Sequence, residues 1–194
     1  MNDLVLELVS DYGLWLVGIT TFLSCLAIPA PASLVMIASG AFAASNDLSL
    51  YLTATAAFIG AVAGDQSGFA IGRRGQAHVT QWGKENGRRG ALFNKARDFM
   101  QKWGRTSVFL SRWLFSPLGP YVNFVAGANG VAWRVFTPAA AMGEVIWVAL
   151  YIGLGFVFAD SIEMVADFAS NISGLLAAAL MAGLLGRYLF RAPK

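Results

Sequence analysis

The feature that most constrains the fold is an uncharged stretch of 33 residues, 13–45, interrupted near its middle by Pro29 and Pro31. A membrane-crossing helix takes roughly 20 apolar residues, so this stretch is too long for one crossing and too short for two. Proline removes a backbone donor and ends a helix. The sequence therefore predicts two half-length helices, 14–28 and 32–45, that form a re-entrant hairpin. Irregular backbone at this depth must be covered by protein or line a wet cavity.

The rest of the chain has the same apolar character. Of its 194 residues, 57% are hydrophobic and only 13% are charged, whereas a soluble domain carries about 25% charged residues. We therefore expect an all-α integral membrane protein with one membrane domain, 13–187. Its predicted segments are an interfacial amphipathic helix 1–12, the re-entrant hairpin 13–45, a span 48–72, a basic loop 73–105, a second re-entrant hairpin 106–132 broken at Pro117 and Pro120, spans 135–159 and 169–187, and a tail 188–194.

The charges predict the orientation. The loop 73–105 holds nine basic residues against Glu85 and Asp98, which leaves seven positive charges with His78 neutral. By the positive-inside rule, this loop and the basic C-terminal tail are expected on the cytoplasmic side, and the acidic connector 160–167 outside. Within the loop, Phe93, Arg97, Met100 and Trp103 have the spacing of an amphipathic helix that lies along the inner surface.

In this topology the first hairpin enters the membrane from outside and the second from inside. Each hairpin is followed by a span, which is the order of an inverted-topology repeat. Proline-interrupted apolar segments at matching positions of two halves are a sequence signal for a transport site. The predicted fold is therefore two opposed re-entrant helical hairpins plus transmembrane helices.

Four ionisable residues lie in apolar surroundings: Asp65, Arg112, Glu144 and, at a boundary, Arg134. Such residues normally face a bundle interior or a cavity. Arg112, five residues before Pro117, is placed to hold a phosphate by bidentate hydrogen bonds; alternatively it snorkels to the inner surface. Asp65 is a candidate proton site or the ion-pair partner of Arg112. Glu144 is a candidate for proton coupling or a neutral acid that bonds a neighbouring helix.

Other residues indicate packing rather than chemistry. Glycines recur every four residues at 60, 64, 68 and 72, a spacing that lets membrane helices approach closely. The lone Cys25 is expected to be a small packed side chain. We find no catalytic triad, metal-ligand cluster or P-loop, so we expect no enzyme, no cofactor and no metal. The basic residues are not spread as a nucleic-acid-binding face.

Three motifs resemble the DedA family of VTT-domain membrane proteins. They cover about residues 25–158, and their order and spacing are more specific than any one of them. The motifs are Gly-Asp-Gln-Ser-Gly-Phe-Ala-Ile-Gly-Arg at 64–73, preceded by Gly60; Ser-Arg at 111–112 through Pro117 to Ala-Gly at 126–127; and Gly-Glu-Val-Ile-Trp at 143–147 followed by Tyr151, Gly153 and Gly155.

The resemblance implies two opposed re-entrant hairpins and transport of lipid across the bacterial inner membrane, with undecaprenyl phosphate recycling as the leading proposal. Two features depart from the family pattern. Relatives carry acidic residues beside the first proline break, whereas Ser24–Leu26 and Pro31–Ser33 contain none, and a second loop arginine is missing near 118–120. These departures favour a different phospholipid or exchange without proton coupling.

From the sequence we therefore expect a multi-pass inner-membrane protein that moves an anionic lipid, with a homo-oligomer left open. The alternatives are a proton-coupled transporter of small solutes or ions and a non-transporting membrane organiser. The expected lipid-binding residues flank the two breaks: Pro29, Pro31, Arg112, Pro117, Gly119, Pro120 and Asn123.

Overall fold

The computed structural model describes residues 2–82, 87–104, 106–114 and 116–159, and every regular element in these ranges is helical. Residues up to Val157 form one compact unit. The predicted last span, 169–187, and the tail, 188–194, lie outside the described residues. The elements are α1 (Asn2–Cys25), α2 (Ala32–Ala44), α3 (Leu50–Arg74), α4 (Gln76–Trp82), α5 (Arg88–Trp103), α6 (Thr106–Trp113), the 3₁₀ turn η1 (Ser116–Leu118), α7 (Gly119–Ala128) and α8 (Trp133–Val157).

Helix α1 differs from the predicted division into an interfacial helix 1–12 and a half-helix 14–28. It is one continuous helix of 24 residues, and it ends at Cys25. A single glycine in a helix costs only about 1 kcal/mol relative to alanine, so Gly13 does not break it. The helix 32–45 was predicted almost to the residue, because Ala32–Ala44 forms α2.

The first break is a Schellman motif at the end of α1. The backbone N–H groups of Ile28 and Ala27 donate to the carbonyls of Leu23 and Ser24, and Ala27 has a positive φ of 61°. This pattern satisfies the last helix carbonyls, and the proline that follows stops the helix from continuing. Pro31 is then the residue that caps the N-terminus of α2.

The second break falls where the sequence predicted it. Helix α6 ends at Trp113, η1 contains Pro117, and α7 begins at Gly119 with Pro120 in its first turn. Proline is favoured in a first helical turn because its missing N–H would have no partner there. The two proline pairs thus end one helix and begin the next at both breaks.

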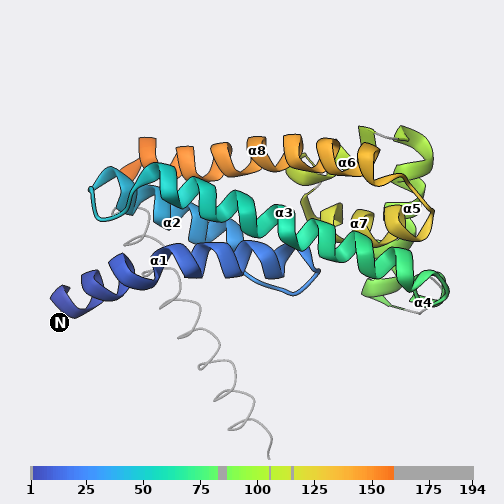
Figure 1. Cartoon of the computed structure of the whole chain (residues 1–194), viewed down its shortest axis with the longest axis horizontal. Helices are drawn as coiled ribbons and strands as arrows, with labels where there is room; N and C mark the ends of the chain where they lie inside the picture. Colours follow the sequence, from blue (N-terminus) through green and yellow to red (C-terminus); the bar gives the residue numbers. More distant parts are fainter. Residues whose placement is uncertain (1, 83–86, 105, 115, 160–194) are drawn as a thin grey trace, which may run out of the picture. The chain divides into compact units, whose positions relative to one another are not determined.

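The two helices that flank each break, here called the arms of the broken hairpin (α1 and α2 for the first, α6 and α7 for the second), pack on different long helices, α3 and α8. Helix α3 packs against α1 over its first half and against α7 over its second half, whereas α8 packs against α6 and α2. In Figure 1, α3 and α8 run in opposite directions, with α1 beneath one end of α3 and α7 near the other. Each broken hairpin therefore places one arm on α3 and the other on α8. The predicted inverted repeat and the re-entrant placement of the hairpins stay predictions.

Glycines allow these helices to pack at short distances from one another. A Cβ atom on Gly60 or Gly64 would collide with backbone of α1, and one on Gly72 would collide with Phe124 of α7. The same holds on α8, where a Cβ on Gly155 would collide with Ile37 of α2. The packing role predicted for the glycine stripe of α3 is thus what the structure shows.

The basic loop contains α4 and α5, so its amphipathic helix is present at Arg88–Trp103. Its apolar face packs on protein, because Phe93 and Ala96 are buried in a cluster with Phe124 of α7. Phe93 meets Tyr121 edge-on, with ring centroids 5.1 Å apart. Trp103, in contrast, is 46% exposed. The prediction that this face lies along a membrane surface therefore does not apply to Phe93.

Among the described residues, α8 is the one helix that is both long and apolar enough to cross a membrane. Ala32–Ala44 is a shorter apolar helix, and Tyr12–Cys25 is the apolar part of the 24-residue helix α1. The predicted span 48–72 coincides with α3, whose polar and glycine residues lower its hydropathy.

Candidate functional site

Arg112 lies at the centre of a buried ionic cluster that joins α3, α6 and α8. Its Nη1 atom is 2.9 Å from Oδ1 of Asp65, and its Nε atom is 3.6 Å from Oε1 of Glu144. All three residues are at most 3% exposed. In this structure Asp65 therefore pairs with Arg112, and Arg112 lies in the interior instead of reaching toward the surface.

Asn123 of α7 connects this cluster to the first break. Its Oδ1 accepts a short hydrogen bond from Nη2 of Arg112, and its Nδ2 donates to Oδ1 of Asp65 at 2.8 Å. The same Nδ2 donates to the carbonyl oxygen of Cys25 at 3.3 Å. That carbonyl belongs to the last turn of α1, where helix carbonyls lack intrahelical partners. Asn123 thus ties the ends of both breaks to one ion pair.

The shape of the cluster depends on the absence of side chains beside Arg112. A Cβ atom on Gly143 would lie 2.5 Å from Cγ of Arg112 and 2.9 Å from the carbonyl oxygen of Phe109. The guanidinium carbon lies 5.9 Å from the ring centroid of Phe136, within the range of a cation–π contact. Gly143 therefore lets the stem of Arg112 lie directly against α8, next to Glu144.

Several polar atoms of the cluster have no hydrogen-bond partner. These are Oδ2 of Asp65, Nε of Arg112, Oε2 of Glu144 and Nε1 of Trp147. A small cavity of about 30 Å³ lies beside three of these residues, Arg112, Glu144 and Trp147. Its other lining residues are Ser24, Cys25, Ser111, Gly119 and Pro120. A cavity needs roughly 10–15 Å³ of such space to hold one water molecule. The cavity is therefore of a size for one water or one oxygen atom of a ligand.

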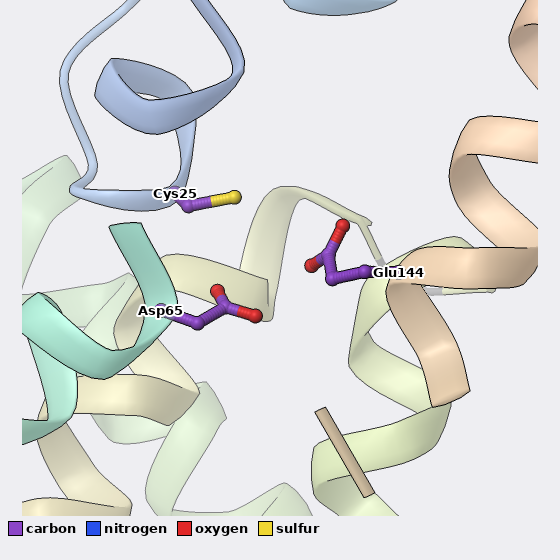
Figure 2. A group of neighbouring side chains, drawn as sticks. All are labelled: Cys25, Asp65 and Glu144. Atoms are coloured by element: carbon purple, nitrogen blue, oxygen red, sulfur yellow. The ribbon is translucent and has the colours of Figure 1, made fainter. Parts of the chain in front are cut away.

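Figure 2 shows the side chains of Cys25, Asp65 and Glu144 pointing toward one another. One potential ligand atom from each lies within 4.8 Å of the others, so these three residues could contact a metal ion. The guanidinium of Arg112 already pairs with Asp65 at 2.9 Å and lies near Glu144. A cation placed among these carboxylates would be repelled by that charge, so the geometry favours Arg112 over a metal as their counter-ion.

A larger open cavity of about 1060 Å³ lies at the two breaks. It borders the small cavity, because Ser24 and Pro120 line both. The residues that line the larger cavity come from both breaks, from the loop helices and from α8: Ser24, 26–30, Pro117, Pro120, Tyr121, Phe124, Trp82, Leu92, Phe93 and Tyr151.

The residues predicted to bind lipid therefore do not form one site. Pro29, Pro117 and Pro120 line the larger cavity, whereas Arg112 and Asn123 belong to the buried cluster with both acidic candidates. Gly119 lines the small cavity between them. Pro31 does not line either cavity and caps α2 instead.

The sequence did not reveal the parts played by Cys25 and Trp147. Cys25 takes part through its backbone carbonyl. Every residue has such a carbonyl, so the residue type does not indicate this role. The available signal was its position directly before a break, since helix-end carbonyls need a donor from elsewhere. Trp147 was seen only as part of a motif, and its indole N–H is buried without a partner.

Comparison with known proteins identifies the family of this chain. The sequence model of the VTT domain matches residues 28–157, which include both breaks and every charged residue of the cluster. The chain belongs to the VTT-domain family. It is accordingly a DedA-family membrane protein, as its motifs suggested.

Relatives agree with this assignment. The chain is 29% identical to Protein DedA of Escherichia coli (strain K12), over 92% of this chain and 85% of that protein. It is 27% identical to the uncharacterized membrane protein YbfM of Bacillus subtilis (strain 168), over 79% of this chain and 94% of that protein. No solved structure matches the chain.

Proposed function

We propose that this DedA-family protein moves an anionic lipid between the two leaflets, with undecaprenyl phosphate as the leading candidate. The observation that carries the proposal is that the two proline breaks, one from each half of the chain, line the same open cavity of about 1060 Å³. Binding pockets for drug-sized ligands have volumes of roughly 300–1,000 Å³. The cavity therefore has room for a lipid headgroup and the start of its chain.

The lining suits a molecule with a polar head and an apolar tail. Aromatic rings of Trp82, Tyr121 and Tyr151 combine an apolar body with a polar tip, and Ile28 and Phe93 are wholly apolar. Broken helices in membrane transporters commonly form the substrate site at the interface of two repeats. We accordingly propose that the hairpins are re-entrant, that they form an inverted repeat and that the basic loop is cytoplasmic.

Arg112 is not free to hold a phosphate in this structure. It is 3% exposed, it pairs with Asp65 and it bonds Asn123. Its Nε atom, however, has no hydrogen-bond partner and lies beside the small cavity. In our proposal a phosphate oxygen reaches Nε only after the side chain of Glu144 has moved away, so phosphate binding and rearrangement of the cluster occur together.

A second candidate is a proton-coupled transporter of small solutes or ions. The observation that favours it is the presence of two buried carboxylates beside one guanidinium. Ionisable residues within membrane segments mark proton relays as well as substrate paths. In this alternative, the larger cavity admits a small solute and the lipid is only its surroundings.

Exchange of labelled lipid in liposomes tests the first candidate. The full chain is reconstituted with a fluorescent polyprenyl phosphate in both leaflets, and an impermeant quencher reports how much lipid moves outward. Ala30 lines the cavity, so Ala30→Trp should narrow it and lower exchange well below the wild-type rate. Ala63, which is exposed on α3, gives the matched control Ala63→Trp, which should exchange normally.

The other outcomes separate the alternatives. Exchange at the protein-free rate by the wild type would contradict lipid movement. Solute uptake that follows an imposed pH gradient would then favour the second candidate, and neither activity would favour a non-transporting membrane organiser.

A further inference from the structure

The charges of the buried cluster do not balance. Asp65, Arg112 and Glu144 are 0%, 3% and 2% exposed, and together they would hold two negative charges and one positive charge if all were ionised. The described residues provide no other ion-pair partner for either carboxylate. An uncompensated charge is strongly unfavourable in a low-dielectric interior. One unit of positive charge is therefore missing from the cluster.

Between the two carboxyl groups, no hydrogen-bond donor is present among the described residues. Oδ2 of Asp65 and Oε2 of Glu144 both lack a partner, and the two carboxyl groups face each other in Figure 2. Ligand oxygens of the two groups lie within 4.8 Å of one another. A protonated carboxyl donates one hydrogen bond, whereas an ionised carboxylate only accepts. A single proton on one of these oxygens would supply both the missing charge and the missing donor.

The two carboxyl groups differ in how well they are stabilised as anions. Oδ1 of Asp65 accepts from Asn123 at 2.8 Å and lies 2.9 Å from Nη1 of Arg112. Glu144 approaches the guanidinium only to 3.6 Å, and Nε of Arg112 forms no hydrogen bond with it. Charge-assisted hydrogen bonds favour the ionised form, so the ionised residue of the pair is Asp65.

We propose that Glu144 carries a proton and shares it with Asp65, so that the cluster is a neutral proton-binding site. The Glu144 carboxyl donates toward the free oxygen of Asp65, and Asp65 remains ion-paired with Arg112. The proposal does not depend on what the chain transports, because it concerns the charge state of the cluster alone.

The surroundings of Glu144 contain few other groups that could replace this proton. The thiol of Cys25 approaches from α1, Asp65 from α3 and Arg112 from α6, while Asn123 of α7 bonds the latter two. Helix α2 also packs on α8 but contains no ionisable side chain. Glu144 lines the small cavity, which borders the larger open one at Ser24 and Pro120. The proton therefore exchanges from the side of the larger cavity.

Infrared spectroscopy of the purified full chain tests the proposal, because a protonated carboxyl has a C=O stretching band that an ionised carboxylate lacks. At neutral pH the wild type should show this band, with the small shift in D₂O that identifies an exchangeable proton. Glu144→Gln should abolish the band. Asp47 is an exposed carboxylate, so the control Asp47→Asn should leave it unchanged.

Thermal unfolding gives a second, independent measurement. Glutamine has nearly the shape of a protonated glutamate and the same charge, so Glu144→Gln should keep a Tm within a few degrees of the wild type. Asp65→Asn should lower the Tm far more, because it removes the closest counter-ion of Arg112. A wild type without the band, a band that survives Glu144→Gln, or failure of Glu144→Gln to fold would each overturn the proposal.

Discussion

The side-chain amide of Asn123 donates a hydrogen bond to the carbonyl oxygen of Cys25, which lies 98 residues earlier in the chain. The bond joins the last turn of α1 to α7 at the point where both helices meet a proline break. Because the same amide also bonds Asp65 and Arg112, the two breaks and the ionic cluster hold one another in place.

Replacing Asn123 should therefore destabilise the protein strongly. Asn123→Ala removes three hydrogen bonds and leaves buried partners unsatisfied, each at a cost of about 1–3 kcal/mol. We expect a loss of about 3 kcal/mol or more in the free energy of unfolding, measured by denaturation in detergent. Asn129 is exposed at the end of the same helix, and Asn129→Ala should cost much less. Equal effects of the two changes would contradict the role given to Asn123.

A methyl group at Gly143 should displace Arg112. The added carbon would lie 2.5 Å from Cγ of Arg112, and overpacking of this kind typically costs about 1–3 kcal/mol. Gly143→Ala should lower both the Tm and lipid exchange. Gly153 on the same helix has no atom within 4 Å of the corresponding position, so Gly153→Ala should be neutral or slightly stabilising. A Gly143→Ala protein with wild-type Tm would show that Arg112 does not need this contact.

The ion pair of Arg112 and Asp65 should appear as a strong coupling in a double-mutant cycle. Removing one partner of a buried pair costs about 3–5 kcal/mol, because the other charge is left uncompensated. Arg112→Ala should be severely destabilised, and Asp65→Asn in the same chain should restore part of the loss. Additive effects on the Tm would mean that the two side chains act independently.

Replacing Arg112 with lysine tests whether the positive charge is sufficient or whether the planar guanidinium is also needed. A lysine keeps the positive charge but cannot bond Asp65 and Asn123 through a planar fork. We expect Arg112→Lys to fold and insert with a lowered Tm and to lose most lipid exchange in liposomes. Full exchange in this variant would rule out a phosphate-binding role that depends on the guanidinium.

Cysteine labelling tests the orientation. Gln101 and Asp47 are exposed, in the basic loop and in the α2–α3 connection respectively, and the native Cys25 is buried. An impermeant thiol reagent applied to intact cells should label Asp47→Cys but not Gln101→Cys. Opening the membrane should then label both. The opposite pattern in intact cells would reverse the proposed topology.

The sequence predicted the helix breaks well because proline acts locally. The ends of α2, α6 and α7 follow from backbone donors and turn geometry within a few residues. The charged residues of the site were also found, since ionisable groups in an apolar run are conspicuous. Their pairing was left open between alternatives, because Asp65, Arg112 and Glu144 lie far apart in sequence and only the helix packing brings them together.

The course of α1 and the position of α5 were predicted less well. An acidic, polar first turn suggested a separate helix, yet no residue between Gly13 and Cys25 interrupts the backbone hydrogen bonds of α1. Phe93 has the periodicity of a surface-binding helix, but it is buried against α7. Hydrophobic periodicity shows that a face is apolar and does not show whether lipid or protein covers it.

The two arms of each hairpin pack on different long helices, α3 and α8. The helix contacts of this protein must therefore form in a certain order during synthesis. Helix α2 has its main packing partner in α8, so the glycine-lined contact of Gly40 and Gly155 cannot form until the ribosome has made the far end of the chain. Until then α2 can pack only on α1 and α3, and the side of α2 that faces α8 stays uncovered. Stalling translation between α5 and α6 should therefore give a nascent chain in which α2 is accessible to crosslinking by the insertion machinery, whereas α1 is already paired with α3.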